Sequence, residues 1–438
     1  MGETSALQQN GTPEKPLFPM KYAIIIPDGC ADWPIESLGG RTPLQAARTP
    51  NMDSLAASGI VGWSKNVPAE LPPGSDVATL SLFGFDPLTC FTGRAPLEAA
   101  AQGIELKPNE WAFRCNLVTI SPRSPTNPME LMQSSTAGHI STEEAAALLQ
   151  SLQEESGGAG VRFSSGVGYR NLLIFSENAE KPVFTWETRT FPPHDYLEQP
   201  IEPILPQGAG CNLLLHLMHE SRRVFAGHPV NRRRIEQGKL PATQCWLWGQ
   251  GRKPSIEPFA SRFRETVGGK TLRGAMITAV DLLRGIAKLI GWSVLDVPGI
   301  TGYIDTDYAA KGRAASEILA ECDLVCVHIE APDESGHEGS AGKKVRSLEE
   351  IDEKIVGPVA EALKKYDDWR ILVSPDHPTP VALKTHTHDP VPWLMAGSDL
   401  QPDDADRYDE PTAEGSSRSF EPGWKLMPYF LKAADGKF

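Results

Sequence analysis

Carboxylate and imidazole side chains gather in one stretch of the sequence, between positions 333 and 388. Asp333 and His337 lie four residues apart around a glycine that permits a tight turn, which suits two ligands of one metal ion. Asp376 is followed directly by His377, and both side chains could face one crevice where a strand ends. Taken alone, the spacing of Asp333 and His337 is common by chance, and Asp376-His377 could instead be a capping Asp beside a surface histidine.

Two further histidines, His386 and His388, would face the same side of an extended segment, one as a ligand and the other as its neighbour. Four of the ten histidines thus lie near an Asp or another His, which favours metal binding over scattered core histidines. Mixed carboxylate and imidazole ligands suit Mn²⁺, Zn²⁺ or Co²⁺ better than Mg²⁺, and Mn²⁺ is the first choice.

Three short apolar runs, each leading into an Asp, are expected to form the strands that position these side chains. Residues 22–27 stop at Asp28, residues 324–329 lead to Asp333, and residues 371–374 lead to Asp376. Helical patterns alternate with these runs. This alternation predicts a parallel sheet covered by helices on both faces, with ligands bound beyond the carboxyl ends of the strands.

The parallel sheet would bring Asp28 into one crevice with Asp333 and Asp376, although more than 300 positions separate the first from the others. Three Asp and three His residues exceed what one ion can use while it keeps an open position. We therefore expect two divalent ions, which together can stabilise the attacking and leaving oxygens of a phosphoryl transfer.

Ser75 is the candidate nucleophile. It follows a flexible glycine and precedes a helix-like stretch, and the more common role of such a serine is the helix N-cap. Near two metals, a serine at a helix N-terminus could also be activated by coordination and receive a phosphoryl group. The two roles could coexist.

The length of 438 residues predicts two compact units. Residues 49–59 and about 345–365 carry helical patterns that belong with the three strands. Proline-rich stretches in the middle of the chain indicate an inserted second domain, in which residues 141–144 have the spacing of a capping box. The first domain is expected to resume near Gly274 with a helix over residues 275–290, and residues 1–20 are expected to be a disordered tail.

Charge and composition narrow the classes of partner. The net charge of −14 argues against nucleic acids and anionic membranes, but allows a small anionic substrate held by local arginines or metals. No apolar run approaches the roughly 18 residues that span a bilayer, and residues 1–20 contain no secretory signal. The seven cysteines form no CxxC pair, which favours buried thiols in a reducing compartment, the cytoplasm.

Five motifs carry a resemblance to a known family. They are Pro73-Gly-Ser-Asp-Val-Ala78, Thr92-Gly-Arg-Ala-Pro-Leu97, Ser135-Thr-Ala-Gly-His139, Glu330-Ala-Pro-Asp-Glu-Ser-Gly-His337 and Asp376-His-Pro-Thr-Pro380. From about Tyr22 to Pro392 the sequence resembles the cofactor-independent phosphoglycerate mutases of the archaeal type, members of the alkaline phosphatase superfamily. The resemblance implies an α/β fold with an alkaline-phosphatase-like core, residues 21–102 and 271–438, interrupted by a smaller α/β substrate domain, residues 103–270.

The resemblance also implies roles for individual residues. One metal would be held by Asp28, Ser75, Asp376 and His377, and the other by Asp333, His337 and a later histidine. His386 matches the family's His-Thr-x-x-Pro-Val-Pro pattern, whereas His388 occupies a position that is usually not histidine. Arg114, Arg170 and Arg252 are candidates to clamp phosphate and carboxylate, with surface salt bridges as the alternative. His139 is a candidate substrate contact or simply the residue before a helix.

The implied activity is the interconversion of 3-phosphoglycerate and 2-phosphoglycerate through a phosphoserine at Ser75, with two metals and without 2,3-bisphosphoglycerate. The inserted domain would act as a lid that keeps water from the phosphoserine. If water reached it, the same metal core would make a phosphatase or phosphodiesterase, which is the main alternative. A phosphometabolite-binding protein without turnover is the non-enzymatic alternative.

Overall fold

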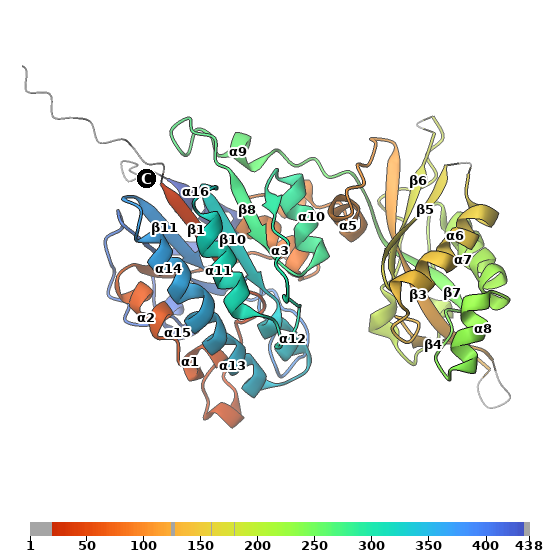
Figure 1. The fold of residues 1–438 in the computed structure, drawn as a ribbon, viewed down its shortest axis with the longest axis horizontal. Helices are drawn as coiled ribbons and strands as arrows, with labels where there is room; N and C mark the ends of the chain where they lie inside the picture. The colour runs from red at the N-terminus through yellow and green to blue at the C-terminus, as the bar shows by residue number, and fades with distance from the viewer. Residues whose placement is uncertain (1–19, 124–127, 159, 179, 433–438) are drawn as a thin grey trace, which may run out of the picture.

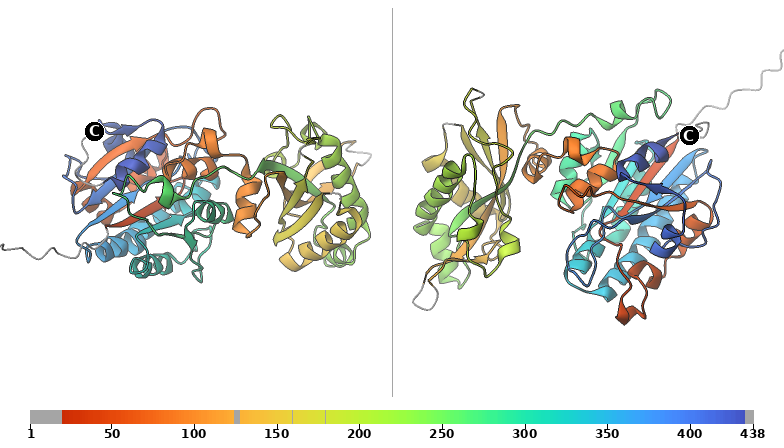
Figure 2. Two further views of the ribbon diagram at one scale, coloured as in Figure 1. Left: turned by 90° about the horizontal axis from the view of Figure 1, so that it is seen from above. Right: turned by 180° about the vertical axis from the view of Figure 1, so that it is seen from behind.

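The computed structural model describes residues 20–123, 128–158, 160–178 and 180–432. They form two bodies that lie next to each other along the longest axis of the molecule, each with its own β-sheet (Figure 1). The views from above and from behind show the same separation (Figure 2). The expected disordered tail, residues 1–20, lies outside the described residues except for Met20, which packs against the core of the larger body.

The larger body contains an eight-stranded sheet in the order β13-β2-β12-β11-β1-β10-β8-β9. Neighbours from β11 to β9 are parallel, while β12 runs antiparallel to both β11 and β2. The strands are β1 (Lys21–Pro27), β2 (Ile60–Ser64), β8 (Gly274–Ile277), β9 (Ser293–Val294), β10 (Leu324–Ile329), β11 (Trp369–Val373), β12 (Val391–Gly397) and β13 (Ser419–Phe420). The three strands expected from the sequence are confirmed as β1, β10 and β11.

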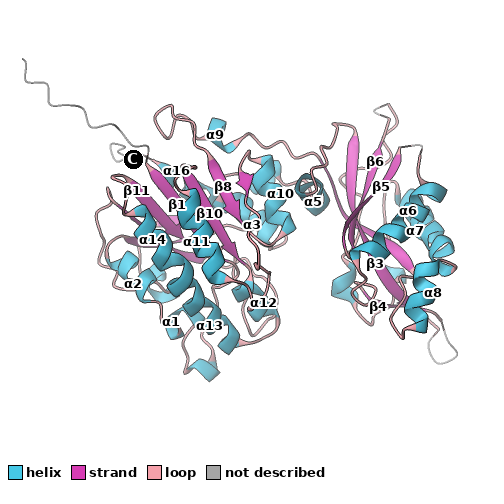
Figure 3. Ribbon diagram, in the orientation of Figure 1, coloured by secondary structure: helices cyan, strands magenta, loops and turns pink. Residues whose placement is uncertain are grey.

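Both faces of this sheet are buried, as alternate residues of β1 demonstrate. Ile24 packs into one core cluster and Ile25 into another on the opposite face, and both are fully buried. The cluster on the Ile25 side is completed by α1 (Pro43–Ala46), α2 (Pro50–Ala57), α11 (Tyr308–Ile318), α12 (Ala331–His337), α13 (Ala341–Ile351), the π-helical turn η4 (Asp352–Val356), α14 (Gly357–Leu363) and α15 (Glu410–Glu414). The cluster on the Ile24 side is completed by α3 (Ser75–Leu82), α4 (Pro87–Cys90), α5 (Arg94–Ala101), α9 (Phe259–Arg262), α10 (Asp281–Leu289) and α16 (Leu426–Leu431). The expected parallel-rich sheet with helices on both faces is thus confirmed (Figure 3).

The helical expectations in this body are met in two cases and wrong in part of a third. Residues 50–57 are α2, and residues 341–363 form one continuous helical stretch through α13, η4 and α14. The helix expected over residues 275–290 begins only at Asp281, because residues 274–277 are β8, which pairs with β10. A short apolar run fits a helix or a buried strand equally well, and the neighbouring strand decided between them.

The smaller body is an antiparallel sheet centred on β3, which pairs with β4, β6 and β7, while β5 pairs with β6. Its elements are β3 (Glu110–Ser121), β4 (Leu131–Ser134), β5 (Val161–Val167), β6 (Arg170–Ser176), β7 (Gln244–Arg252), α6 (Thr142–Ser156), α7 (Cys211–Ala226) and α8 (Pro229–Glu236), with the 3-10 turns η2 (Pro193–Tyr196) and η3 (Glu202–Ile204). Helices α6, α7 and α8 pack against one face of the sheet. The predicted capping box is present, since Ser141 Oγ accepts from Glu144 N and the Glu144 carboxylate accepts from Ser141 N.

Helix α5 lies between the two bodies (Figure 1). Its Ala95 and Ala99 pack on the small sheet, and its Leu97 packs in the core of the larger body. Phe259 and Phe263, which the expected insert of residues 103–270 includes, also pack in the larger body. The chain therefore returns to the large sheet soon after β7 ends.

All seven cysteines are free, and six of them are buried.

The described helices are all too short or too polar to cross a lipid bilayer. Two short 3-10 turns, η1 (Glu36–Leu38) and η5 (Gly423–Lys425), complete the elements of the larger body.

Candidate metal centre and nucleophile

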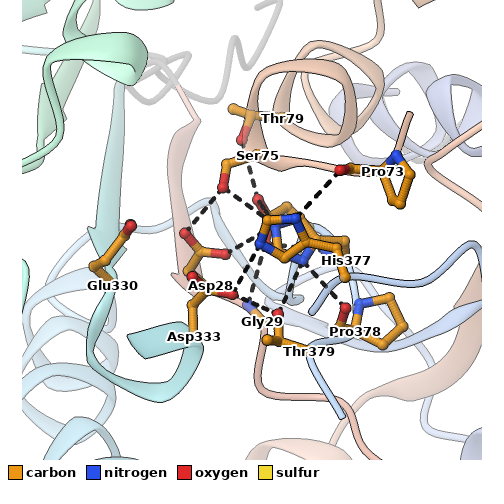
Figure 4. Close-up of polar contacts among 12 residues, drawn as sticks. Asp28, Gly29, Pro73, Ser75, Thr79, Glu330, Asp333, His377, Pro378 and Thr379 are labelled. Atoms are coloured by element: carbon orange, nitrogen blue, oxygen red, sulfur yellow. Dashed lines mark hydrogen bonds and ion pairs between the residues drawn. The ribbon is translucent and has the colours of Figure 1, made fainter. Parts of the chain in front are cut away.

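The carboxyl ends of three adjacent strands bring the predicted ligands together. β10, β1 and β11 are parallel neighbours, so the residues that follow them meet at one edge of the sheet. Asp28 follows β1, Asp333 lies in α12 after β10, and Asp376 and His377 follow β11. The side chains of Asp28, Asp333 and His377 converge in the close-up of Figure 4.

Gly29 makes this close approach possible. Its φ of 60° is in the left-handed region, and a Cβ on it would lie 2.5 Å from both Asp333 Oδ1 and Thr379 Oγ1. Any larger residue at position 29 would displace Asp333 and Thr379.

The first group of ligand atoms surrounds Ser75. Ser75 Oγ lies 3.1 Å from His377 Nε2 and 3.4 Å from Asp28 Oδ2. His377 Nε2 is 3.4 Å from Asp28 Oδ1 and 3.6 Å from Asp376 Oδ2. Asp28, Asp376 and His377 have no exposed surface and Ser75 is 8% exposed, so water has little access to the serine hydroxyl.

The second group consists of Asp333, His337 and His386. The two Nε2 atoms lie 3.0 Å apart, and each faces an oxygen of Asp333, at 3.2 Å for His337 and 3.5 Å for His386. The Nδ1 atoms contact backbone carbonyls of Lys384 and Pro73, which only accept hydrogen bonds. In the neutral rings the protons therefore sit on Nδ1, and two nitrogen lone pairs converge with a carboxylate oxygen, as the ligands of a cation do.

His388 lies outside both groups. Its Nε2 contacts the carbonyl oxygen of Leu71 at 2.9 Å. Of the two histidines that the sequence leaves open, the structure brings His386 to the centre.

The electrostatics of the centre fit a pair of divalent cations. Burial raises the pKa of Asp28 well above its usual value, and the nearby charges of Asp376, Glu330 and Asp333 raise it further. Among the described residues, no hydrogen-bond partner reaches the buried Asp28 Oδ1. Cations would offset this crowding of buried carboxylates, and the mixed oxygen and nitrogen donors suit Mn²⁺, Zn²⁺ or Co²⁺.

Ser75 is not the N-cap of its helix. It is the first residue of α3, and Gly74 holds the N-cap position without a side-chain hydrogen bond. The capping interpretation of Ser75 is therefore wrong, because its hydroxyl is directed toward Asp28 and His377 instead.

Arg94, in the motif of residues 92–97, is a functional candidate that becomes apparent only in the structure. Its Nε is 2.9 Å from Asp76 Oδ2, while Asp76 Oδ1 accepts from Val77 N at 3.0 Å. A Cβ on Gly74 would lie 3.4 Å from Arg94 Nη2, so the guanidinium lies beside the backbone that carries Ser75. Only the fold brings the start of α5 next to the start of α3.

Arg114 lies near Arg94 on the side of the smaller body. It is buried, pairs with Glu98 at 3.0 Å and stacks on Trp248, with 4.2 Å from guanidinium carbon to ring centroid. Burial lowers the pKa of Arg114, and the positive charges of Arg94 and Arg170 act in the same direction. The charges of three guanidinium groups, from α5, β3 and β6, thus act on one another.

The remaining predicted substrate residues have different surroundings. Arg170 is exposed at the turn between β5 and β6, beside the Tyr169 ring. The exposed His139 lies in the turn after β4, with a φ of 52°. Arg252 lies opposite Trp111, and Glu177 binds its guanidinium, so the structure does not bring it to the other arginines.

Two further residues at the centre were missed. His328 Nε2 is 2.8 Å from Asp28 Oδ2, and Glu330 lies next to Asp28 and His328. The sequence offered one indication of His328, since it is the only polar side chain able to ionise as a base within the apolar run of residues 324–329.

Comparison with known proteins gives concordant results. The family model for 2,3-bisphosphoglycerate-independent phosphoglycerate mutase matches residues 56–231. The protein of that name from Methanothrix thermoacetophila is 48% identical over 395 residues, covering 90% of this chain and 95% of its own. One from Geobacter sulfurreducens, named as a probable member, is 45% identical over 413 residues, covering 94% and 100%.

Solved structures agree with these relatives. The cofactor-independent phosphoglycerate mutase of Thermoplasma acidophilum superposes with a TM-score of 0.63 at 25% identity, covering 95% of this chain and all of its own. A protein from Pyrococcus horikoshii superposes with a TM-score of 0.75 at 27% identity, covering 96% and 100%.

Proposed function

This chain belongs to the 2,3-bisphosphoglycerate-independent phosphoglycerate mutases and is an isomerase, and we propose that it interconverts 3-phosphoglycerate and 2-phosphoglycerate through a phosphoserine at Ser75. The observation that carries this proposal is the position of Ser75 Oγ within the first group of ligand atoms, 3.1 Å from His377 Nε2 and 3.4 Å from Asp28 Oδ2. The low exposure of Ser75 supports transfer between bound groups rather than to water.

Two divalent cations, Mn²⁺ by preference and Zn²⁺ or Co²⁺ as alternatives, fit the ligand atoms of the centre. Asp28, Ser75, Asp376 and His377 would hold one, and Asp333, His337 and His386 the other. When bound, the cations supply positive charge beside the serine oxygen and the phosphoryl oxygens. The site needs no 2,3-bisphosphoglycerate, because Ser75 itself carries the phosphoryl group.

The covalent steps balance within the enzyme and substrate. Ser75 Oγ attacks phosphorus, the bond from phosphorus to the C3 oxygen of 3-phosphoglycerate breaks, and that oxygen takes a proton as the serine hydroxyl loses one. The glycerate then turns within the site. Its C2 hydroxyl oxygen then attacks the phosphorus of the phosphoserine and loses its proton. The bond from phosphorus to Ser75 Oγ breaks, and Ser75 Oγ takes up a proton.

Arg94, Arg114 and Arg170 are proposed to bind the phosphate and carboxylate of the substrate. Guanidinium groups bind such anions bidentately, and Asp76 orients Arg94 beside Ser75. The buried pair of Arg114 with Glu98 positions a second guanidinium in the neighbouring β3 strand. Reorientation of the glycerate requires anion contacts that persist while the phosphoryl group is on Ser75, and these guanidinium groups would provide them.

The smaller body is proposed to be the substrate domain that excludes water while the phosphoserine exists. It is connected to the larger body through α5, so closure would move Arg114 and Arg170 relative to Ser75. The seven free cysteines support a reducing compartment, and we propose the cytoplasm.

Incubation of purified protein with 3-phosphoglycerate and Mn²⁺, without 2,3-bisphosphoglycerate, tests the proposal. We expect 2-phosphoglycerate to accumulate until it reaches equilibrium with 3-phosphoglycerate, as followed by phosphorus NMR. Release of inorganic phosphate without 2-phosphoglycerate would instead identify a phosphatase with the same centre.

A further inference from the structure

Three buried polar side chains form a row along the carboxyl edge of the large sheet. Thr278 directly follows β8, His328 lies in β10, and Asp28 directly follows β1. These strands are neighbours, and His328 lies opposite Ile26, two residues before Asp28 on the same face. Because all three residues are fully buried, they must satisfy their hydrogen bonds with one another or with the surrounding protein.

The hydrogen bonds run in one direction along this row. Thr278 Oγ1 accepts from Val280 N at 3.1 Å, which leaves its hydroxyl proton for His328 Nδ1, also at 3.1 Å. His328 Nε2 lies 2.8 Å from Asp28 Oδ2. If Nδ1 accepts, the ring proton is on Nε2 and points at the carboxylate.

The other forms of His328 are less favourable. With the proton on Nδ1, the Nε2 lone pair would face a carboxylate oxygen at 2.8 Å, and the Thr278 hydroxyl would have no acceptor among its contacts in the described residues. A doubly protonated ring would place a second positive charge beside Lys311, whose Nζ donates to the His328 carbonyl at 2.8 Å. The neutral ring with its proton on Nε2 satisfies Thr278 Oγ1, both ring nitrogens and Asp28 Oδ2.

We propose that His328 is a positioning residue for Asp28: Thr278 holds its proton on Nε2, and His328 donates that proton to Asp28 Oδ2. This bond fixes one carboxylate oxygen and leaves the other, Oδ1, directed toward His377. The inference rests on the proposed role of Asp28 as a metal ligand, and it states how that ligand is oriented.

The same geometry decides the role of a third group of ligand-type atoms. Asp28, His328 and Glu330 lie close enough to hold an ion of their own. A ring that carries its proton on Nε2 has no lone pair there for a metal. His328 is therefore not a ligand, and the chain should bind two ions rather than three.

Nitrogen-15 NMR of histidine-labelled wild-type protein, with and without Zn²⁺, tests the tautomer directly. We expect the His328 signal, assigned by its loss in His328→Gln, to show a protonated Nε2 and an unprotonated Nδ1 in both states. A proton on Nδ1, or three bound Zn²⁺ ions per chain in a titration, would overturn the inference.

A pair of variants at Thr278 provides the second test. Thr278→Ser keeps the hydroxyl and serves as the matched control, whereas Thr278→Val removes it. We expect Thr278→Val to weaken Mn²⁺ binding about 10–100-fold and to lower kcat with little change in KM, while Thr278→Ser stays near wild type. Equal Mn²⁺ affinity in the two folded variants would overturn the inference.

These measurements separate the inference from the proposed function. A protonated Nε2 in a protein without mutase activity would support the positioning role of His328 and contradict the proposed reaction. An active mutase with the His328 proton on Nδ1 would support the proposed reaction and contradict the positioning role of His328.

Discussion

The Nε2 atoms of His337 and His386 lie 3.0 Å apart, although the two residues belong to different segments of the chain. Backbone carbonyls of Lys384 and Pro73 occupy the opposite sides of the two rings. Two nitrogen lone pairs are therefore directed at one point beside Asp333. This relationship is the basis of the first prediction.

Replacement of His386 by Ala should remove one of the two metal ions, because it deletes a ligand atom that faces Asp333. His388→Ala is the matched control, since His388 contacts the Leu71 carbonyl instead. Metal content after dialysis against Mn²⁺, measured by elemental analysis, should be about one ion for the first variant and about two for the second. The reverse pattern would show that His388 is the ligand.

Ser75→Ala should reduce turnover about 10⁴-fold or more, because it removes the oxygen that receives the phosphoryl group. Metal binding should largely persist, since Asp28, Asp376 and His377 stay in place. Ser81→Ala in the same helix provides the control, with activity expected near that of wild type. Substantial turnover by Ser75→Ala would exclude the phosphoserine route.

Arg94→Lys should lower kcat/KM about 10²–10³-fold, because an ammonium cannot reproduce the guanidinium geometry that Asp76 orients beside Ser75. Arg252→Lys should change kcat/KM little, since Glu177 already binds that side chain. Steady-state kinetics with 3-phosphoglycerate measures both. A large loss of kcat/KM in Arg252→Lys alone would show that Arg252, and not Arg94, binds the substrate.

Gly29→Ala should disturb the metal centre as well as lower stability. The left-handed backbone at Gly29 costs alanine about 1–2 kcal/mol, and its Cβ would meet Asp333 and Thr379 at 2.5 Å. Gly103→Ala has a similar φ of 75° and open space around the Cβ, so it isolates the backbone cost. Denaturant unfolding and Mn²⁺ titration should show a loss of metal affinity only for Gly29→Ala.

The protein should become less stable as the pH rises from about 4.5 to about 7, because the Glu410 carboxyl titrates differently in the folded and unfolded states. Burial raises the pKa of Glu410 from 4.5 to about 7, and the hydrogen bond from Thr42 opposes the rise. The folded state therefore keeps a proton that the unfolded chain loses, and unfolding is favoured as the pH increases through this window. The contribution is at most roughly 3 kcal/mol.

Glu410→Gln removes this titration. The difference in free energy of unfolding between variant and wild type, measured by urea unfolding, should shift in favour of the variant between pH 4.5 and 7. A difference that stays constant across this range would contradict the raised pKa.

The strands and the candidate ligand residues that follow them were predictable because they depend on local pattern. Buried parallel strands are short apolar runs. Asp28 directly follows one of them, and Asp376 lies three residues after the end of another. The helix over residues 275–290 was partly wrong because residues 274–277 suit either structure and pair with β10 only in the fold. Arg94 was missed because its partner, Asp76, lies in another helix.

The sequence by itself determined which residues could bind metal, which strands carry them and which family the chain resembles, since these depend on residue type and periodicity. Only the tertiary structure decided between His386 and His388, separated Arg252 from Arg94 and Arg114, and placed His328 against Asp28. The physical reason is that hydrogen bonds and ligand atoms act over about 3 Å. Residue spacing in a chain does not define distances of that size between segments that meet only on folding.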